Sequence, residues 1–134
     1  MSAIPASPLV LLVDDFDDGR ELYAEYLEFR GYRIVTAGSG AEALTVARLP
    51  DRPALILMDL RMFGISGLEA MRVLRADSEF ADVPIVAFTA QAMDNEREAA
   101  IVDGFDAVIT KPCLPDELAA LIDQYLSLRL RSSA

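Results

Sequence analysis

The sequence predicts a three-layer (βα)₅ α/β fold, in which five parallel strands form one doubly wound sheet with helices on both faces. Short apolar segments alternate strictly with segments of helical spacing, which is typical of right-handed strand-helix-strand units. Three of the strand-like segments are apolar throughout, as central strands of a parallel sheet usually are. The length of 134 residues and the hydrophobic fraction of 53% suit a single domain with one core.

The first interval between strands is expected to be an amphipathic helix. Leu22, Tyr23, Tyr26 and Leu27 have the spacing of one inward face, and Gly31 is placed to end the helix. The strand-like segments on which this and the other helices pack are rich in β-branched residues. They span residues 9–13, 33–36, 54–58, 84–88 and 107–109.

The other four helices are expected from their start signals and apolar spacing. The second begins with the capping-box pattern Ser39 to Glu42, and the third spans about 66–76. The fourth, about 93–102, is weakly patterned, and the fifth starts after Pro115. Inward positions are Ala43, Leu44 and Ala47 in the second, Leu68, Met71 and Leu74 in the third, and Leu118, Leu121, Ile122, Tyr125 and Leu126 in the fifth.

Composition excludes several classes of protein. The formal net charge of −10 argues against a nucleic-acid surface, and no apolar run reaches the roughly 20 residues of a membrane helix. The start lacks the features of a secretory signal, so a cytoplasmic location is expected. The lone Cys113 is interpreted as a packing residue. Residues 9–130 are expected to form the domain, with a loose arm at 1–8 and a tail at 131–134.

Polar side chains follow the predicted strands at the point where each strand ends. Asp14 and Asp15 follow the first strand, Asp59 the third, Thr89 the fourth and Lys111 the fifth. In open parallel sheets, ligands bind beyond the carboxyl ends of the strands, where the order of connections reverses. These five residues are therefore expected to meet at one edge.

Three carboxylates at one place repel one another and need a cation. Oxygen ligands with room for water favour Mg²⁺, and the chain has no histidine, which makes zinc improbable. A carboxylate beside Mg²⁺, a hydroxyl and an ammonium is able to accept a phosphoryl group as a nucleophile. Lys111 is the single lysine among eleven arginines, which suggests that a compact ammonium is required there.

Four motifs in this order give the sequence a recognisable resemblance. The segments LLVDD (11–15), ILMDLRM (56–62), VAFTA (86–90) and ITKP (109–112) resemble the receiver domain of two-component response regulators, the CheY-like family. The resemblance covers about Leu9 to Leu130 and implies the flavodoxin-like strand order 2-1-3-4-5. It also implies a module that receives a phosphoryl group from another protein.

The resemblance assigns a role to each matching position. Asp59 is then the phosphoacceptor, and Mg²⁺ is held by Asp14, Asp15, Asp59 and the backbone carbonyl of Arg61. The other matched positions are Thr89, Ala90 and Lys111, which bind the phosphoryl group or switch with it, Gly67 after the acceptor loop, and Pro112, which usually follows a cis bond in this family.

The resemblance also implies partners. The phosphoryl donor is a sensor histidine kinase or a histidine phosphotransfer protein, and the only chemistry expected is self-phosphorylation and self-dephosphorylation at Asp59. A downstream protein target is expected on the face of helix 93–102, strand 107–109 and the last helix. A homodimer is left open. A stand-alone receiver or relay intermediate is expected because no output domain fits after Leu130, and the receiver of a longer protein is the alternative.

Two alternatives to a phosphorylated receiver remain. One is suggested by residues that differ from the receiver pattern, and the other by a partial match to the motif of another family. Phe63 stands where a proline is usual, Val108 where an aromatic switch residue is common, and Cys113 where Phe is frequent. These departures suggest a receiver fold that has lost phosphorylation and acts only by binding. A haloacid-dehalogenase-like phosphatase also uses an Asp-x-Asp motif, as at Asp15 to Asp17. That family expects Thr where this chain has Gly19.

Overall fold

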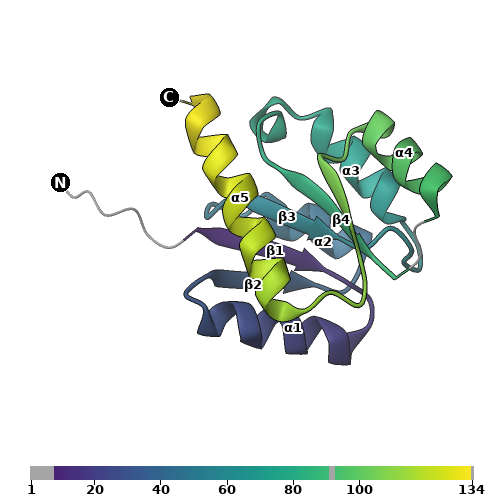
Figure 1. The fold of residues 1–134 in the computed structure, drawn as a ribbon. Helices are drawn as coiled ribbons and strands as arrows, with labels where there is room; N and C mark the ends of the chain where they lie inside the picture. Colours follow the sequence, from purple (N-terminus) through teal and green to yellow (C-terminus); the bar gives the residue numbers. More distant parts are fainter. Residues whose placement is uncertain (1–7, 91–92, 134) are drawn as a thin grey trace.

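A computed structural model describes residues 8–90 and 93–133, with side chains as far as residue 127. Its centre is a five-stranded parallel sheet in the order β2-β1-β3-β4-β5, as the resemblance implied (Figure 1). The predicted strands are confirmed to within one residue at each end. They are β1 (Leu9–Val13), β2 (Arg33–Ala37), β3 (Leu55–Met58), β4 (Ile85–Thr89) and β5 (Ala107–Thr110).

Helices cover both faces of the sheet, so the predicted three-layer architecture is confirmed (Figure 1). Helices α1 and α5 pack on one face, and α2, α3 and α4 pack on the other. A short 3₁₀ helix between α3 and β4 was not expected from the sequence. The helices are α1 (Asp17–Phe29), α2 (Gly40–Ala47), α3 (Gly67–Arg75), η1 (Ser78–Phe80), α4 (Asp94–Asp103) and α5 (Pro115–Ser133).

The alternation of side chains along each strand divides the core into two parts. Leu11 and Val13 of β1 face α2 and α3, whereas Val10 and Leu12 face α1 and α5. All four side chains are at most 1% exposed. Because both faces are buried, β1 is apolar throughout and its first polar residue, Asp14, appears where the strand ends.

The inward face of α1 differs from the expectation at one residue. Leu27 is buried and Tyr23 and Tyr26 are half-buried, but Leu22 is 63% exposed. Successive helical residues are about 100° apart, so a stripe centred on Ala24 and Leu27 turns Leu22 about 200° away from Ala24. The apolar spacing around Leu22 therefore predicted too wide a face.

Helix starts follow the expected capping chemistry. The Ser39 hydroxyl accepts a hydrogen bond from the Glu42 N–H at the start of α2, while the Glu42 carboxylate accepts one from the Gly38 N–H. A reciprocal capping box between Ser66 and Glu69 begins α3. Residues 59–66, between β3 and α3, form the acceptor loop, and this cap fixes where that loop ends.

The ends of the chain are described only in part. Of the expected arm at 1–8, only Pro8 lies within the described residues. Helix α5 continues to Ser133, past the boundary at residue 130 that the sequence suggested. Among the residues that the structure describes, none of the helices has the length and apolar character needed to cross a bilayer.

Candidate functional site

The sheet delivers the five polar residues to one edge. Asp14 and Asp59 directly follow β1 and β3, Thr89 is the last residue of β4, and Lys111 directly follows β5. The parallel register aligns these ends, because Val13 is paired with Met58 and Thr89 with Thr110. The structure thus brings together the residues that the sequence singled out.

Three carboxylates form an acidic cluster at this edge. One oxygen each from Asp14, Asp15 and Asp59 lies within 4.8 Å of the others. Asp14 is 3% exposed and Asp59 is 9% exposed, whereas Asp15 is half-buried. Such a group of partly desolvated charges is costly unless cations compensate it.

Lys111 supplies one compensating charge. Its ammonium forms an ion pair with Asp14 and lies 3.6 Å from Oδ2 of Asp59. The Lys111 side chain is 17% exposed, so its charge is screened less than that of a surface lysine. Its backbone N–H donates to the Thr89 carbonyl at 2.8 Å, which ties the end of β5 to the end of β4.

The environment of Asp59 acts on its protonation in both directions. Burial raises the pKa of the Asp59 carboxyl above its ordinary value, and the neighbouring charge of Asp14 acts in the same sense. Three contacts lower the pKa instead. They are the charge of Lys111, the Arg61 N–H that donates to Oδ1 of Asp59 at 3.2 Å, and a hydrogen bond with the Thr89 side chain. Thr89 is 1% exposed, so its hydroxyl is shielded from water.

Arg20 supports the β1–α1 loop and was not identified from the sequence. Its guanidinium donates to the Asp14 carbonyl at 2.7 Å and forms an ion pair with Asp17. The Phe16 N–H also donates to Oδ1 of Asp14 at 2.9 Å. The spacing of Asp17 and Arg20, three residues apart at a helix start, is the only signal of this arrangement in the sequence.

Residue 67 has to be glycine because the start of α3 lies very close to the backbone of Asp59. A Cβ atom at this position would lie 1.9 Å from the Asp59 carbonyl oxygen, so only glycine allows α3 to start against the acceptor loop. Within that loop Gly64 has a φ of 75°, which favours glycine. On the other side of the site, the Lys111–Pro112 bond is cis, as the resemblance implied.

The acidic cluster fits a magnesium ion. Ligands at about 2.1 Å on opposite sides of Mg²⁺ lie about 4.2 Å apart, so small side-chain rotations bring all three oxygens within reach of one ion. Asp14, Asp15 and Asp59 offer only hard oxygen ligands, and the half-buried Asp15 leaves that side open to water. The Arg61 backbone lies beside the Asp59 carboxylate, as its N–H contact shows.

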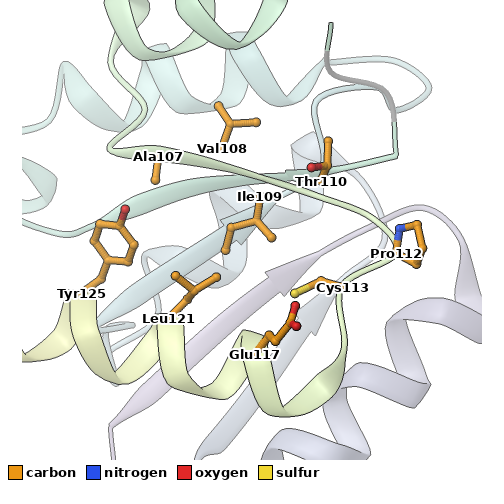
Figure 2. A pocket seen from close by; sticks show the side chains of 9 residues that line it. All are labelled: Ala107, Val108, Ile109, Thr110, Pro112, Cys113, Glu117, Leu121 and Tyr125. Atoms are coloured by element: carbon orange, nitrogen blue, oxygen red, sulfur yellow. The ribbon is translucent and has the colours of Figure 1, made fainter. Parts of the chain in front are cut away.

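The positions that depart from the resemblance differ in exposure. Phe63 is 90% exposed and lines an open pocket of about 320 Å³ with Asp15, Arg61 and Met62. Ala90, next to Thr89, is exposed. Val108 is buried in β5 and points away from α5 (Figure 2). The inner side of β5 therefore has no aromatic ring at this position.

A second hollow lies between β5 and α5 (Figure 2). It has a volume of about 370 Å³, and Leu121 and Tyr125 of α5 line it opposite Ile109 of β5. Cys113 and Glu117 close the end that is nearer to Lys111. Since β5 is an edge strand, this hollow is accessible from outside the sheet.

These groups together suit one kind of chemistry. A carboxylate at the strand end is available as a nucleophile, and an ammonium and a hydroxyl lie where oxygens of an acyl phosphate would need compensation. Asp17, the second acid of the Asp-x-Asp pattern, is exposed, paired with Arg20 and outside the acidic cluster. The phosphatase alternative therefore lacks its second carboxylate.

Comparison with known proteins agrees with this geometry. The family model described as "Response regulator receiver domain" matches residues 10–123. The polar-differentiation response regulator DivK of Brucella anthropi is 36% identical over 117 residues, which are 87% of this chain and 94% of the relative.

Solved structures show the same fold. The chemotaxis protein CheY4 of Vibrio cholerae superposes with a TM-score of 0.84 at 28% identity, over 90% of this chain and 99% of that chain. A CheY-like receiver domain protein from Methanospirillum hungatei has a TM-score of 0.84 at 24% identity, over 94% and 98% of the two chains. The family match and the Brucella relative together establish that this chain belongs to the response regulator receiver domain family.

Proposed function

We propose that this receiver accepts a phosphoryl group on Asp59 from a phosphohistidine of a sensor histidine kinase or a histidine phosphotransfer protein. The observation that carries the proposal is the position of the Asp59 carboxylate, which lies among Asp14, Asp15 and Lys111 at the carboxyl edge of the sheet. No other described carboxylate is part of a comparable acidic cluster.

The transfer is a displacement at phosphorus. A carboxylate oxygen of Asp59 forms a bond to phosphorus while the bond from phosphorus to the donor imidazole nitrogen breaks, and the imidazole then takes a proton from solvent. Hydrolysis reverses the modification, because water attacks phosphorus and releases phosphate and the Asp59 carboxylate. Bound Mg²⁺ supplies positive charge that offsets the charge on the phosphoryl oxygens. Lys111 and the Thr89 hydroxyl provide the further contacts.

Signalling follows from a shift between two arrangements of the domain. A phosphoryl group on Asp59 gives Lys111 and Thr89 new partners and favours the arrangement in which those contacts form. Helix α4 is suited to move, because Ala100 is the only one of its residues that is less than a tenth exposed, so few of its side chains pack in the core.

We place the downstream protein target on the face formed by α4, β5 and α5. The hollow between β5 and α5 lies on this face, and Cys113 at its end is two residues from Lys111 (Figure 2). A change at Lys111 therefore has a short path to this surface. A protein partner suits this acidic chain better than nucleic acid, and a cytoplasmic location fits a phosphohistidine donor.

Intact mass measurement tests phosphorylation directly. We expect the wild-type chain, incubated with Mg²⁺ and acetyl phosphate, to gain the mass of one phosphoryl group, and Asp59→Asn to gain none. Asp51→Asn is the matched control, since Asp51 is an exposed acid paired with Arg33 on the surface. A wild-type chain without added mass, or an Asp59→Asn variant that still gains it, would contradict the assignment.

A receiver that works only by binding is the second candidate. It is favoured by Val108, which leaves the inner side of β5 without the aromatic residue common in the family. In that case the mass experiment gives no phosphorylated species, and partner binding is independent of Asp59. Pull-down with and without the phosphoryl mimic beryllofluoride separates the two candidates.

A further inference from the structure

We propose that Tyr23 and Phe88 position Lys111 for phosphoryl binding, with the Tyr23 hydroxyl anchoring the loop after it and the Phe88 ring seating its ammonium. The inference rests on the proposed function, in which Lys111 contacts phosphoryl oxygens. It assigns a role in the site to Tyr23 of α1, which lies outside the family motifs, and to Phe88 of β4, a member of the VAFTA motif to which the resemblance gave no role.

The loop between β5 and α5 is fixed at both ends. Before it, the Lys111 N–H donates to the Thr89 carbonyl at 2.8 Å. After the cis Pro112, the Tyr23 hydroxyl donates to the Cys113 carbonyl at 3.0 Å. Tyr23 lies 90 residues away in the sequence, so this hydrogen bond ties α1 to the segment that carries Lys111.

The Phe88 ring lies beneath the Lys111 ammonium. The distance from Nζ to the ring centroid is 4.9 Å, within the range of a cation–π contact. Phe88 is 1% exposed, and its ring meets the Tyr23 ring edge to face, with centroids 5.0 Å apart and an interplanar angle of 78°. Tyr23 therefore supports the Phe88 ring with its own ring and the loop with its hydroxyl.

This arrangement limits the freedom of a long side chain. A lysine in solution samples many rotamers, and holding it in one of them costs entropy when a ligand binds. Here the Phe88 ring and the carboxylates of Asp14 and Asp59 hold the Lys111 ammonium before any phosphoryl group arrives. The Lys111 side chain therefore loses its rotamer entropy when the protein folds and not when the phosphoryl group binds, which makes phosphoryl binding more favourable.

Cys113 reports on this loop without any phosphorylation. It is the single cysteine of the chain and is 8% exposed, and burial raises the pKa of its thiol. A thiol reagent such as Ellman's reagent therefore reacts at a rate set by opening of the loop. We expect Tyr23→Phe to react about three to ten times faster than wild type, the scale of one neutral hydrogen bond.

Tyr32→Phe is the matched control. It loses a hydroxyl that contacts Asp123 and the Ala119 carbonyl of α5, so it weakens a helix contact and leaves the loop anchor in place. We expect its Cys113 to react within about twofold of wild type, the scatter of a change outside the loop. Equal rates in all three proteins, or equal acceleration in both variants, would overturn the role of Tyr23.

Phosphoryl binding gives the second readout. In the presence of Mg²⁺, we expect the affinity for beryllofluoride, measured by calorimetry, to fall about threefold or more in Tyr23→Phe and in Phe88→Leu, the scale of a weak polar contact. Phe88→Leu keeps an apolar side chain and removes the aromatic ring. Thermal unfolding of each variant identifies loss of the fold.

The two readouts separate the inference from the proposed function. If wild type binds beryllofluoride but both variants bind it equally well, the positioning role is wrong. If wild type does not bind it, the proposed function fails, while the Cys113 rates still decide whether Tyr23 anchors the loop.

Discussion

The ammonium of Lys111 lies 3.6 Å from the Asp59 carboxylate and also pairs with Asp14, so one cation bridges the two most buried acids of the site. Asp15 is half-buried and is not among the acids that Lys111 contacts. With no divalent ion bound, Lys111 is therefore the main compensation for a cluster of three carboxylates.

Removing the Lys111 charge is expected to destabilise the fold. Lys111→Met keeps most of the apolar stem and leaves Asp14 and Asp59 uncompensated, which should lower the free energy of unfolding by about 2 kcal/mol without divalent ions. Mg²⁺ should restore part of this loss, because it supplies the missing charge. Urea unfolding with EDTA and with Mg²⁺ measures both effects.

Arg52→Met is the control for the loss of a basic side chain. Arg52 forms an ion pair with Glu79 in which both side chains are substantially exposed, so its loss should cost less than about 1 kcal/mol. A Lys111→Met variant that is no less stable than Arg52→Met would show that Lys111 does not compensate the cluster.

Asp59→Asn is expected to be more stable than wild type at neutral pH. Burial raises the pKa of Asp59 in the folded state, so the folded protein binds this proton more tightly than the unfolded chain. The free energy of unfolding then falls as the pH rises between the unfolded-state and folded-state pKa values.

Asparagine carries no charge at this position, so the variant does not lose unfolding free energy when the wild-type Asp59 carboxyl ionises. The gain should be present at pH 7 and should shrink toward pH 4, where the wild-type carboxyl takes up its proton. Urea unfolding at both pH values without divalent ions tests the sign. A variant that is less stable than wild type at pH 7 would contradict the raised pKa.

The fold was predictable because local and global signals agree. Strands that are buried on both faces are apolar throughout, as β1 and β3 are, and an acid directly follows each of the two. The inward position of Leu22 was predicted wrongly, because apolar spacing alone does not show how wide the contact of α1 is. The 3₁₀ helix Ser78–Phe80 is too short to leave a periodic pattern.

The site was predictable only where residues follow strand ends. Asp14, Asp59, Thr89 and Lys111 could be placed together because parallel strands end at one edge. The contacts of Arg20 and Tyr23 could not be predicted. Each is a long side chain of α1 that contacts a loop, and the spacing of residues in the sequence does not show which loop it reaches. Phe88 looks like any strand residue until the Lys111 side chain is seen above its ring.

Gly67→Ala is expected to damage the fold at the acceptor loop. The added Cβ would meet the Asp59 carbonyl oxygen at 1.9 Å, and the next nearest atoms are also backbone atoms of Asp59 and Leu60, which cannot swing aside as a side chain can. We expect a loss of about 2–3 kcal/mol, at the upper end of the cost of overpacking. Gly19→Ala is the control, since its Cβ would come within 3.1 Å of only the exposed Phe16 ring. Equal stability of the two variants would argue against the close approach at Gly67.

Magnesium is expected to stabilise the wild-type chain and to need Asp15 for this. An ion that binds only the folded state adds RT ln(1 + [Mg²⁺]/Kd), which is about 1.4 kcal/mol at ten times Kd. Asp15→Asn leaves the Lys111 pairs with Asp14 and Asp59 in place but removes one of the three charged oxygens, so the same Mg²⁺ concentration should stabilise it much less. Thermal unfolding with EDTA and with rising Mg²⁺ measures the difference, and Asp18→Asn, an exposed acid outside the cluster, is the control. If Asp15→Asn and Asp18→Asn respond to Mg²⁺ as wild type does, the ion does not bind at the acidic cluster.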